Sequence, residues 1–93
     1  MTAHEFIGSM TIAMLRLGFE ASMGANQNMI CFENKKGNKS YLHNHDDHIT
    51  LQTYKVTNSA HPELSVSNLC YSERVINTFI NMVKLKLNLV DSN

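Results

Sequence analysis

One tetrapeptide, Asn34-Lys35-Lys36-Gly37, constrains the fold of this 93-residue chain more than any other stretch. Asn at the first position and Gly at the fourth are typical of a type I turn followed by a left-handed residue, which closes a β-hairpin. In such a hairpin Asn34 faces Asn38, and the remaining pairs follow. They are Glu33 with Lys39, Phe32 with Ser40, Cys31 with Tyr41, Ile30 with Leu42, and Met29 with His43. The opposite charges of Glu33 and Lys39 support this register.

A second reversal is predicted at residues 44–47, where the sequence Asn-His-Asp-Asp is polar and turn-prone. It leads into a third strand from His48 to about Val56. This turn places His43 opposite His48, Leu42 opposite Ile49, and Ser40 opposite Leu51. The middle of the chain is therefore predicted to form a three-stranded antiparallel sheet.

Alternate residues of a strand point to opposite faces, so this register sorts the side chains into two sets. The set assigned to the core contains Ile30, Phe32, Leu42, Ile49 and Leu51. The other set contains Met29, Cys31, Tyr41, His43, His48, Thr50, Gln52 and Tyr54. Met, Tyr and His together on an open sheet face are typical of a recognition surface, although Tyr and Thr also suit any pleated surface.

A first helix is predicted with signals at both ends. Thr2 and Glu5 have the spacing of a capping box, so the helix begins at about Ala3. Its apolar stripe contains Phe6, Ile7, Met10, Ala13, Met14 and Leu17. Gly18 ends the helix, because glycine readily adopts the left-handed conformation, and Phe19 then packs back against Met14. Residues 20–27 are predicted to form a loop.

Residues 57–68 are predicted to form a polar connection, with at most a short extended piece at 64–66. A final helix begins near Leu69 or Ser72, capped by Asn68 or Ser72, and runs to about Asn88. Its main apolar stripe contains Ile76, Phe79, Ile80, Val83 and Leu87. Strict alternation over 83–90 also fits a strand, but the helix propensity of Leu and Lys and the absence of Gly and Pro after Glu73 favour the helix.

Three further apolar residues, Met82, Leu85 and Leu89, lie on a different side of this helix. They indicate either a homodimer interface or burial on two sides within one copy. Together these elements predict a single α+β domain over residues 1–93, in the order helix, three strands, helix. Both helices pack on one face of the sheet.

Size and charge limit the function of such a domain. A chain of this length buries roughly 60–65% of its unfolded surface, enough for one core but not for a deep enclosed active site. Eight basic and eight acidic side chains give no net charge, and hence no net basic field to attract nucleic acid. The N-terminus has no basic and apolar leader, and no apolar run is long enough to span a membrane, so a cytoplasmic protein with free Cys31 and Cys70 is expected.

The segment from His43 to His48 concentrates imidazoles and carboxylates. His43, His45, His48 and Asp47 could ligate a divalent ion such as Zn²⁺, but no second cluster with ligand spacing exists. A solvated polar turn is the alternative, and its imidazoles would gain charge below about pH 6.5. No phosphate loop, nucleophile motif or nucleotide fingerprint is present. We therefore expect no cofactor, no metal and no catalytic step.

The predicted order of elements resembles in topology that of double-stranded-RNA-binding domains and of HicA-type RNA-cleaving toxins. Leu17-Gly18-Phe19 matches the Gly-Phe that ends the first helix in the HicA-type pattern. The histidines expected on the first strand of that pattern are missing from residues 28–32. The lysine cluster by which double-stranded-RNA domains hold phosphates is missing from Ser72-Glu73-Arg74-Val75. The activities of these families are therefore not carried over.

The sequence leads to the hypothesis of a small non-enzymatic domain that binds a host or cognate protein. Its size and lack of cofactor motifs suit an inhibitor or antitoxin-like protein of a phage or mobile element. The predicted contact residues are Met29, Tyr41, His43, His48, Gln52 and Tyr54. The alternatives are RNA binding through Lys35, Lys36 and Lys39 beside Tyr41, and metal binding at the histidine-rich turn.

Overall fold

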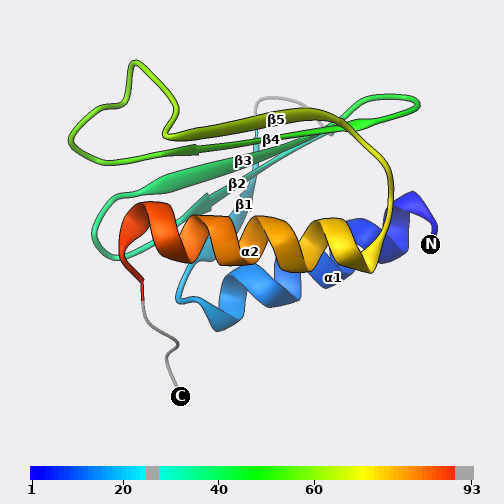
Figure 1. Cartoon of the computed structure of the whole chain (residues 1–93), viewed down its shortest axis with the longest axis horizontal. Coiled ribbons are helices and arrows are strands. Elements are labelled where there is room, and N and C mark those ends of the chain that lie inside the picture. The colour runs from blue at the N-terminus through cyan, green and yellow to red at the C-terminus, as the bar shows by residue number, and fades with distance from the viewer. Residues whose placement is uncertain (25–27, 90–93) are drawn as a thin grey trace.

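In the computed structural model, which describes residues 1–24 and 28–89, two helices cover one face of an antiparallel sheet (Figure 1). The strands follow one another in the sheet in their sequence order. The elements are α1 (Ala3–Arg16), β1 (Glu20–Met23), β2 (Met29–Glu33), β3 (Lys39–Asn44), β4 (Ile49–Tyr54), β5 (Leu64–Leu69) and α2 (Glu73–Leu87). The α+β class and the placement of both helices on one face are as predicted.

The sheet has five strands, so the prediction of three was wrong. The two missed strands, β1 and β5, are its edges. All four residues of β1 are exposed, so this strand buries no apolar side chain, and the four residues Glu-Ala-Ser-Met are too few for their alternation to mark a strand. The order helix, three strands, helix is therefore absent, and the topological resemblance to RNA-binding domains and HicA-type toxins loses its basis.

β5 lies within the segment predicted to be a polar connection. Its inward positions are irregularly spaced, because Leu51 pairs with Val66 whereas Ile49 pairs with Leu69. Two residues of β5 thus oppose one of β4, and Asn68 adopts a left-handed φ of 58° at this bulge. The bulge turns Leu69 back toward the helices. Asn68 is thus part of a strand and caps no helix.

The hairpin between β2 and β3 has the predicted register at all five pairs. Gly37 adopts a φ of 89° in its turn. The side-chain oxygen of Asn34 accepts hydrogen bonds from the backbone amides of Lys36 (3.1 Å) and Asn38 (2.9 Å). These bonds close the turn that the tetrapeptide predicts.

The predicted register between β3 and β4 was wrong by two residues. His43 pairs with Thr50, Leu42 with Leu51, and Ser40 with Thr53. The reversal has the predicted length of four residues but lies one residue further along the chain, because it holds residues 45–48 between the paired Asn44 and Ile49. The amide of His45 donates to the carbonyl of His48 (2.9 Å) within it. A shift of two residues leaves every strand side chain on its predicted face, but His48 lies in the turn and not in β4.

Both helices have the predicted ends. The Thr2–Glu5 capping box is formed, and the amide of Phe19 donates to the carbonyl of Met14 (3.1 Å) as Gly18 ends α1. Ser72 caps α2, so the alternative cap at Asn68 was wrong. The helical interpretation of the segment after Val83 is confirmed through Leu87. Val90, the last residue of the strand alternative, lies outside the described residues.

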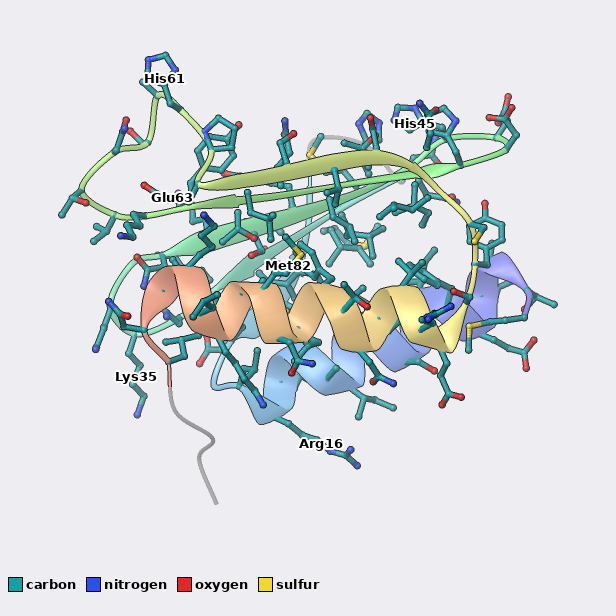
Figure 2. All side chains as sticks on the ribbon, in the orientation of Figure 1. Arg16, Lys35, His45, His61, Glu63 and Met82 are labelled. Carbon is teal, nitrogen blue, oxygen red and sulfur yellow. The ribbon has the colours of Figure 1, made fainter. Side chains whose placement is uncertain are left out.

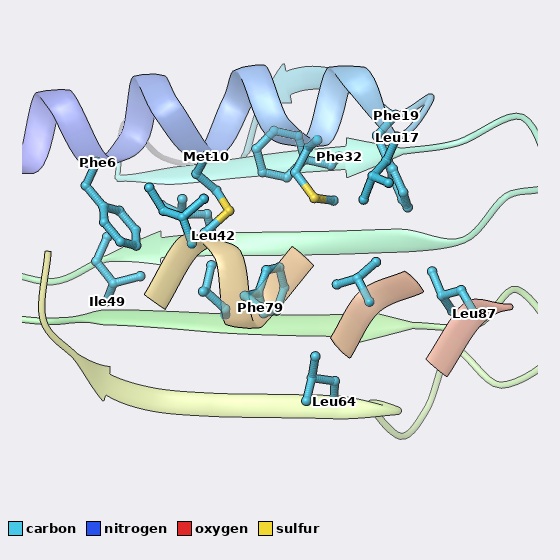
Figure 3. Packing of buried hydrophobic residues seen from close by; sticks show 14 residues of the cluster. Phe6, Met10, Leu17, Phe19, Phe32, Leu42, Ile49, Leu64, Phe79 and Leu87 are labelled. Carbon is cyan, nitrogen blue, oxygen red and sulfur yellow. The ribbon is translucent and has the colours of Figure 1, made fainter. Parts of the chain in front are cut away.

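The core fills the space between the helices and the inner face of the sheet (Figure 3). Of the five predicted sheet residues, Phe32, Leu42, Ile49 and Leu51 are buried, and Ile30 is partly buried against them. The helices and the ends of the sheet contribute Phe6, Met10, Met14, Leu17, Phe19, Leu64, Ile76, Phe79, Val83 and Leu87. With one face covered in this way, the opposite face of the sheet is left open.

Two hydroxyl side chains lie on the buried face of the sheet. Ser40 is 1% exposed and Thr53 is 0% exposed. They are cross-strand partners, and their hydroxyl oxygens are 2.8 Å apart. Each group thus satisfies the other within the core, which makes the pair interdependent.

Replacing Thr53 alone with valine should lower the free energy of unfolding by about 1–2 kcal/mol, because the buried Ser40 hydroxyl loses its partner. The double variant Ser40→Ala/Thr53→Val should recover much of that loss, since neither polar group remains. Urea unfolding of the wild type, both single variants and the double variant gives the coupling. Additive losses would show that the two hydroxyls do not depend on each other.

Candidate functional site

The open face of the sheet contains a depression of about 540 Å³, here called the sheet cleft. Its lining comes from β2, β3, β4 and the loops that follow β2 and β4. The lining residues are Met29, Gly37, Lys39, Tyr41, His43, Thr50, Gln52, Tyr54, Lys55, Val56 and Ser59. Five of the six predicted contact residues, all except His48, are among them. The alternation of the two central strands therefore identified the face on which the cleft lies.

Loops rise at both ends of this face. Figure 2 shows His61, in the connection between β4 and β5, and His45, in the turn between β3 and β4, on the side of the sheet away from the helices. They stand at opposite ends of the view, with the strands between them. The cleft is thus bounded along the strand direction.

One wall of the cleft lies where β4 ends, near Val56. The side chain of Asn38, which is buried, holds this wall in place. Its oxygen accepts a hydrogen bond from the amide of Val56 (3.0 Å), so the loop after β4 is tied to the hairpin between β2 and β3. At Gly37, a Cβ atom would lie 3.0 Å from a methyl group of Val56. The sequence did not reveal this wall, because residue 38 and residue 56 meet only after the strands pair.

Tyr41 and Tyr54 form an aromatic pair on neighbouring strands. Their ring centroids are 5.8 Å apart and their planes meet at 81°, an edge-to-face contact. Partial burial, followed by the nearby Cys31, raises the pKa of the Tyr41 hydroxyl, and Lys39 opposes this shift. The hydroxyl therefore stays protonated at neutral pH and is able to donate a hydrogen bond.

Both Cys31 and Cys70 are free thiols, as expected.

Three imidazole rings stack at the other end of the cleft. The ring centroid of His45 lies 4.3 Å from that of His43 and 4.3 Å from that of His48, and the ring planes meet at 33° and 18°. The ring of His45 is hydrogen-bonded to the Thr50 hydroxyl (3.2 Å), and Nδ1 of His48 lies 2.7 Å from a carboxylate oxygen of Asp47. His48 thus misses its predicted strand position but joins the cleft end through this stack.

Burial is the main cause that lowers the pKa of His45, and the charges of His48 and then His43 add to it. Asp47 and Asp46 act in the opposite direction but more weakly. The hydrogen bond to His48 lowers the pKa of Asp47. The stack therefore disfavours a proton on its central ring.

Among the described residues, no group of three His, Cys, Asp or Glu side chains is placed to hold a metal ion. The arrangement of the rings explains why His43, His45 and His48 do not form a metal site. The lone pair of an imidazole nitrogen lies in the plane of its ring, so rings stacked face to face do not direct these lone pairs to one point. The three imidazole rings therefore form a compact polar cluster at the turn and not a set of metal ligands.

Three lysines of the sheet and its loops lie in two different places. Lys39 and Lys55 line the cleft, whereas Lys35 lies with Glu20 and Glu33 around a separate hollow at the hairpin tip. Figure 2 shows Lys35 on the side of the sheet that carries the helices. The structure thus separates Lys39 from Lys35, its neighbour in the predicted RNA-binding set. Sequence reasoning missed Lys55, which strict alternation assigns to the buried face.

The residues predicted for a dimer interface lie in different settings. Met82 and Leu89 pack partly against the core, whereas Leu85 is 76% exposed. Met82 lines an apolar groove between α2 and β5 with Val66 and Leu69. Burial within one copy therefore accounts for two of the three residues.

The chain matches no protein-family model, and its comparison with curated proteins and with solved structures finds no similar protein. Within residues 1–24 and 28–89, neither helix has the length and apolar character that a membrane crossing requires. The sheet cleft and the histidine stack are the features that bear on function.

The histidine stack predicts a loss of stability on mild acidification. The folded-state pKa of His45 lies below its ordinary value of 6.5, so below pH 6.5 the unfolded chain binds a proton that the folded chain resists, and the free energy of unfolding falls. His45→Gln, whose side chain can still form a hydrogen bond with Thr50, should flatten this decline in the free energy of unfolding. The effect is expected between pH 6.5 and about pH 4.5, where Asp and Glu side chains begin to gain protons.

Urea unfolding at a series of pH values checks this expectation. His61→Gln is the matched control, because His61 lies in the exposed connection away from the stack. The control should retain the wild-type slope. An unchanged slope in His45→Gln would show that the stack does not govern stability in this range.

Proposed function

We propose that this protein is a non-enzymatic domain that binds another protein through the sheet cleft. The observation that carries the proposal is the joint placement of Met29, Tyr41, Gln52 and Tyr54 in one depression on the open face. Tyrosine is enriched where interfaces contribute most of their binding energy, and methionine adapts to varied apolar partners.

The strands beneath the cleft support the proposal. β3 and β4 are each hydrogen-bonded on both edges, so the tyrosine and glutamine side chains stand on the best-supported part of the sheet. Gln52 is further oriented by a hydrogen bond from its amide to the Ser65 hydroxyl on β5 (3.3 Å). A surface ordered before binding loses less conformational entropy when a partner docks.

The chemistry of the lining suits binding better than catalysis. Among the described residues that line the cleft there is no thiol and no carboxylate. His43 is the imidazole of the described lining, and its ring packs against His45. General acid–base catalysis commonly needs a second positioned group to act with such a residue. A phage or mobile-element inhibitor that blocks a host protein in the cytoplasm is the biological role that we propose for this surface.

Truncating the aromatic pair tests the proposal. Tyr41→Ala/Tyr54→Ala should weaken binding of a partner by about 10–100-fold, because two amphipathic rings leave the centre of the contact surface. The wild type and the variant serve as bait in lysates of cells that express the protein. Each protein retained by the wild type is then purified, and its dissociation constant is measured against both forms.

Ile12→Ala/Leu15→Ala is the matched control, since both residues are about half exposed on α1, away from the cleft. It should bind the purified partner as the wild type does. Circular dichroism and urea unfolding establish that all forms are folded. Equal affinity of the tyrosine variant and the wild type would exclude the cleft as the binding surface.

A further inference from the structure

We infer that the cleft binds an acidic, extended segment of its protein partner, with carboxylates at Lys39 and Lys55. This inference rests on the proposed function and adds the chemistry of the occupant. It follows from the distribution of charge, from the order of side chains along the strands, and from the geometry of the tyrosine pair.

The charge of the cleft differs from the charge of the chain. The whole sequence has eight basic and eight acidic side chains, yet the described lining contains the basic residues Lys39 and Lys55 and no Asp or Glu. Glu33 is the cross-strand partner of Lys39, but it lines a separate hollow with Glu20 and is not part of the cleft lining. The charged side chains of the lining are therefore both basic, and at contact distance they complement a negatively charged segment.

The lining is ordered along the strands. Lys39 pairs with Tyr54, and Lys55 follows Tyr54, so both ammonium groups belong to the end that Val56 and Ser59 close. Tyr41 and its partner Gln52 come next, and His43 with Thr50 lies beyond them. From Lys39 to His43 a strand rises about 13 Å, which matches four or five residues of an extended peptide. Such a peptide would place acidic side chains at the lysine end and an apolar side chain on the tyrosine pair.

The same features favour a peptide over single-stranded nucleic acid. Bases bind to proteins largely by stacking on the faces of aromatic rings. In the edge-to-face contact of Tyr41 and Tyr54 one ring face is already covered by the other ring. Lys35 lies on the helix side of the sheet (Figure 2), so the cationic surface does not continue along the hairpin. Zero net charge also removes the long-range attraction for phosphates.

Selection from a displayed library of short random peptides tests the inference without knowledge of the partner. Peptides retained by the immobilised wild-type protein should be enriched in Asp and Glu relative to the unselected library. For a synthesised acidic peptide from this pool, Lys39→Gln/Lys55→Gln should raise the dissociation constant about five- to tenfold. Lys35→Gln/Lys36→Gln, the matched control, removes the same charge from the hairpin tip and should leave the constant within about twofold.

Each other outcome overturns the inference, and the outcomes separate it from the proposed function. Peptides without acidic enrichment that still require Tyr41 and Tyr54 would refute the acidic occupant but leave a protein-binding cleft. Retention of no peptide above a blank support would refute an extended segment, whereas the purified-partner experiment would still test the cleft. An oligouridylate that competes for Lys39 and Lys55 and binds more tightly than the peptides would refute both, in favour of nucleic acid.

Discussion

The coverage of a single face of the sheet is the constraint on which the rest of this structure depends. Phe32, Leu42 and Leu51 lie on three neighbouring strands and point to the same side, where both helices bury them. This burial is the main favourable contribution to folding in so small a domain. Because the pleat alternates, covering that side commits Tyr41, Gln52 and Tyr54 to the opposite side. The open face is thus a consequence of how the core is built.

An open face alone does not make a binding site; the loops around it provide the shape. The buried side chain of Asn38 ties Val56 to the central hairpin and so forms one end of the cleft. The stacked rings of His43, His45 and His48 occupy the other end. Both ends depend on hydrogen bonds or ring contacts between residues of adjoining strands and turns. These contacts fix the shape of the cleft, which loops without such contacts to the strands would not do.

The neutrality of the chain conceals a local separation of charge. Lys39 and Lys55 belong to the cleft, whereas Glu20, Glu33 and Lys35 gather near the hairpin tip. A protein of zero net charge exerts little force on a distant partner, but at contact distance the two lysines are the charged side chains of the described cleft lining. Such an arrangement favours recognition by fit and short-range complementarity over attraction of any polyanion.

The sequence by itself determined the elements whose signals are local. The capping box at Thr2, the end of α1 at Gly18 and the register around Asn34 and Gly37 each depend on residues within a few positions of one another. Such contacts form in the same way wherever the segment lies in the fold. The alternation in β2, β3 and β4 then placed Met29, Tyr41, His43, Gln52 and Tyr54 on one face. A register error of two residues did not change that face.

Tertiary structure alone decided the edges, the walls and the charge of the site. β1 and β5 are strands because neighbouring backbones offer them hydrogen bonds, and these short edge segments bury few of their own side chains. His48 lies in the turn, and Lys55 lines the cleft, because the position of a reversal and the path of a loop depend on how the strands pair and on contacts distant in sequence. Local chemistry specified which face would be open, and only packing between distant residues could give that face its shape.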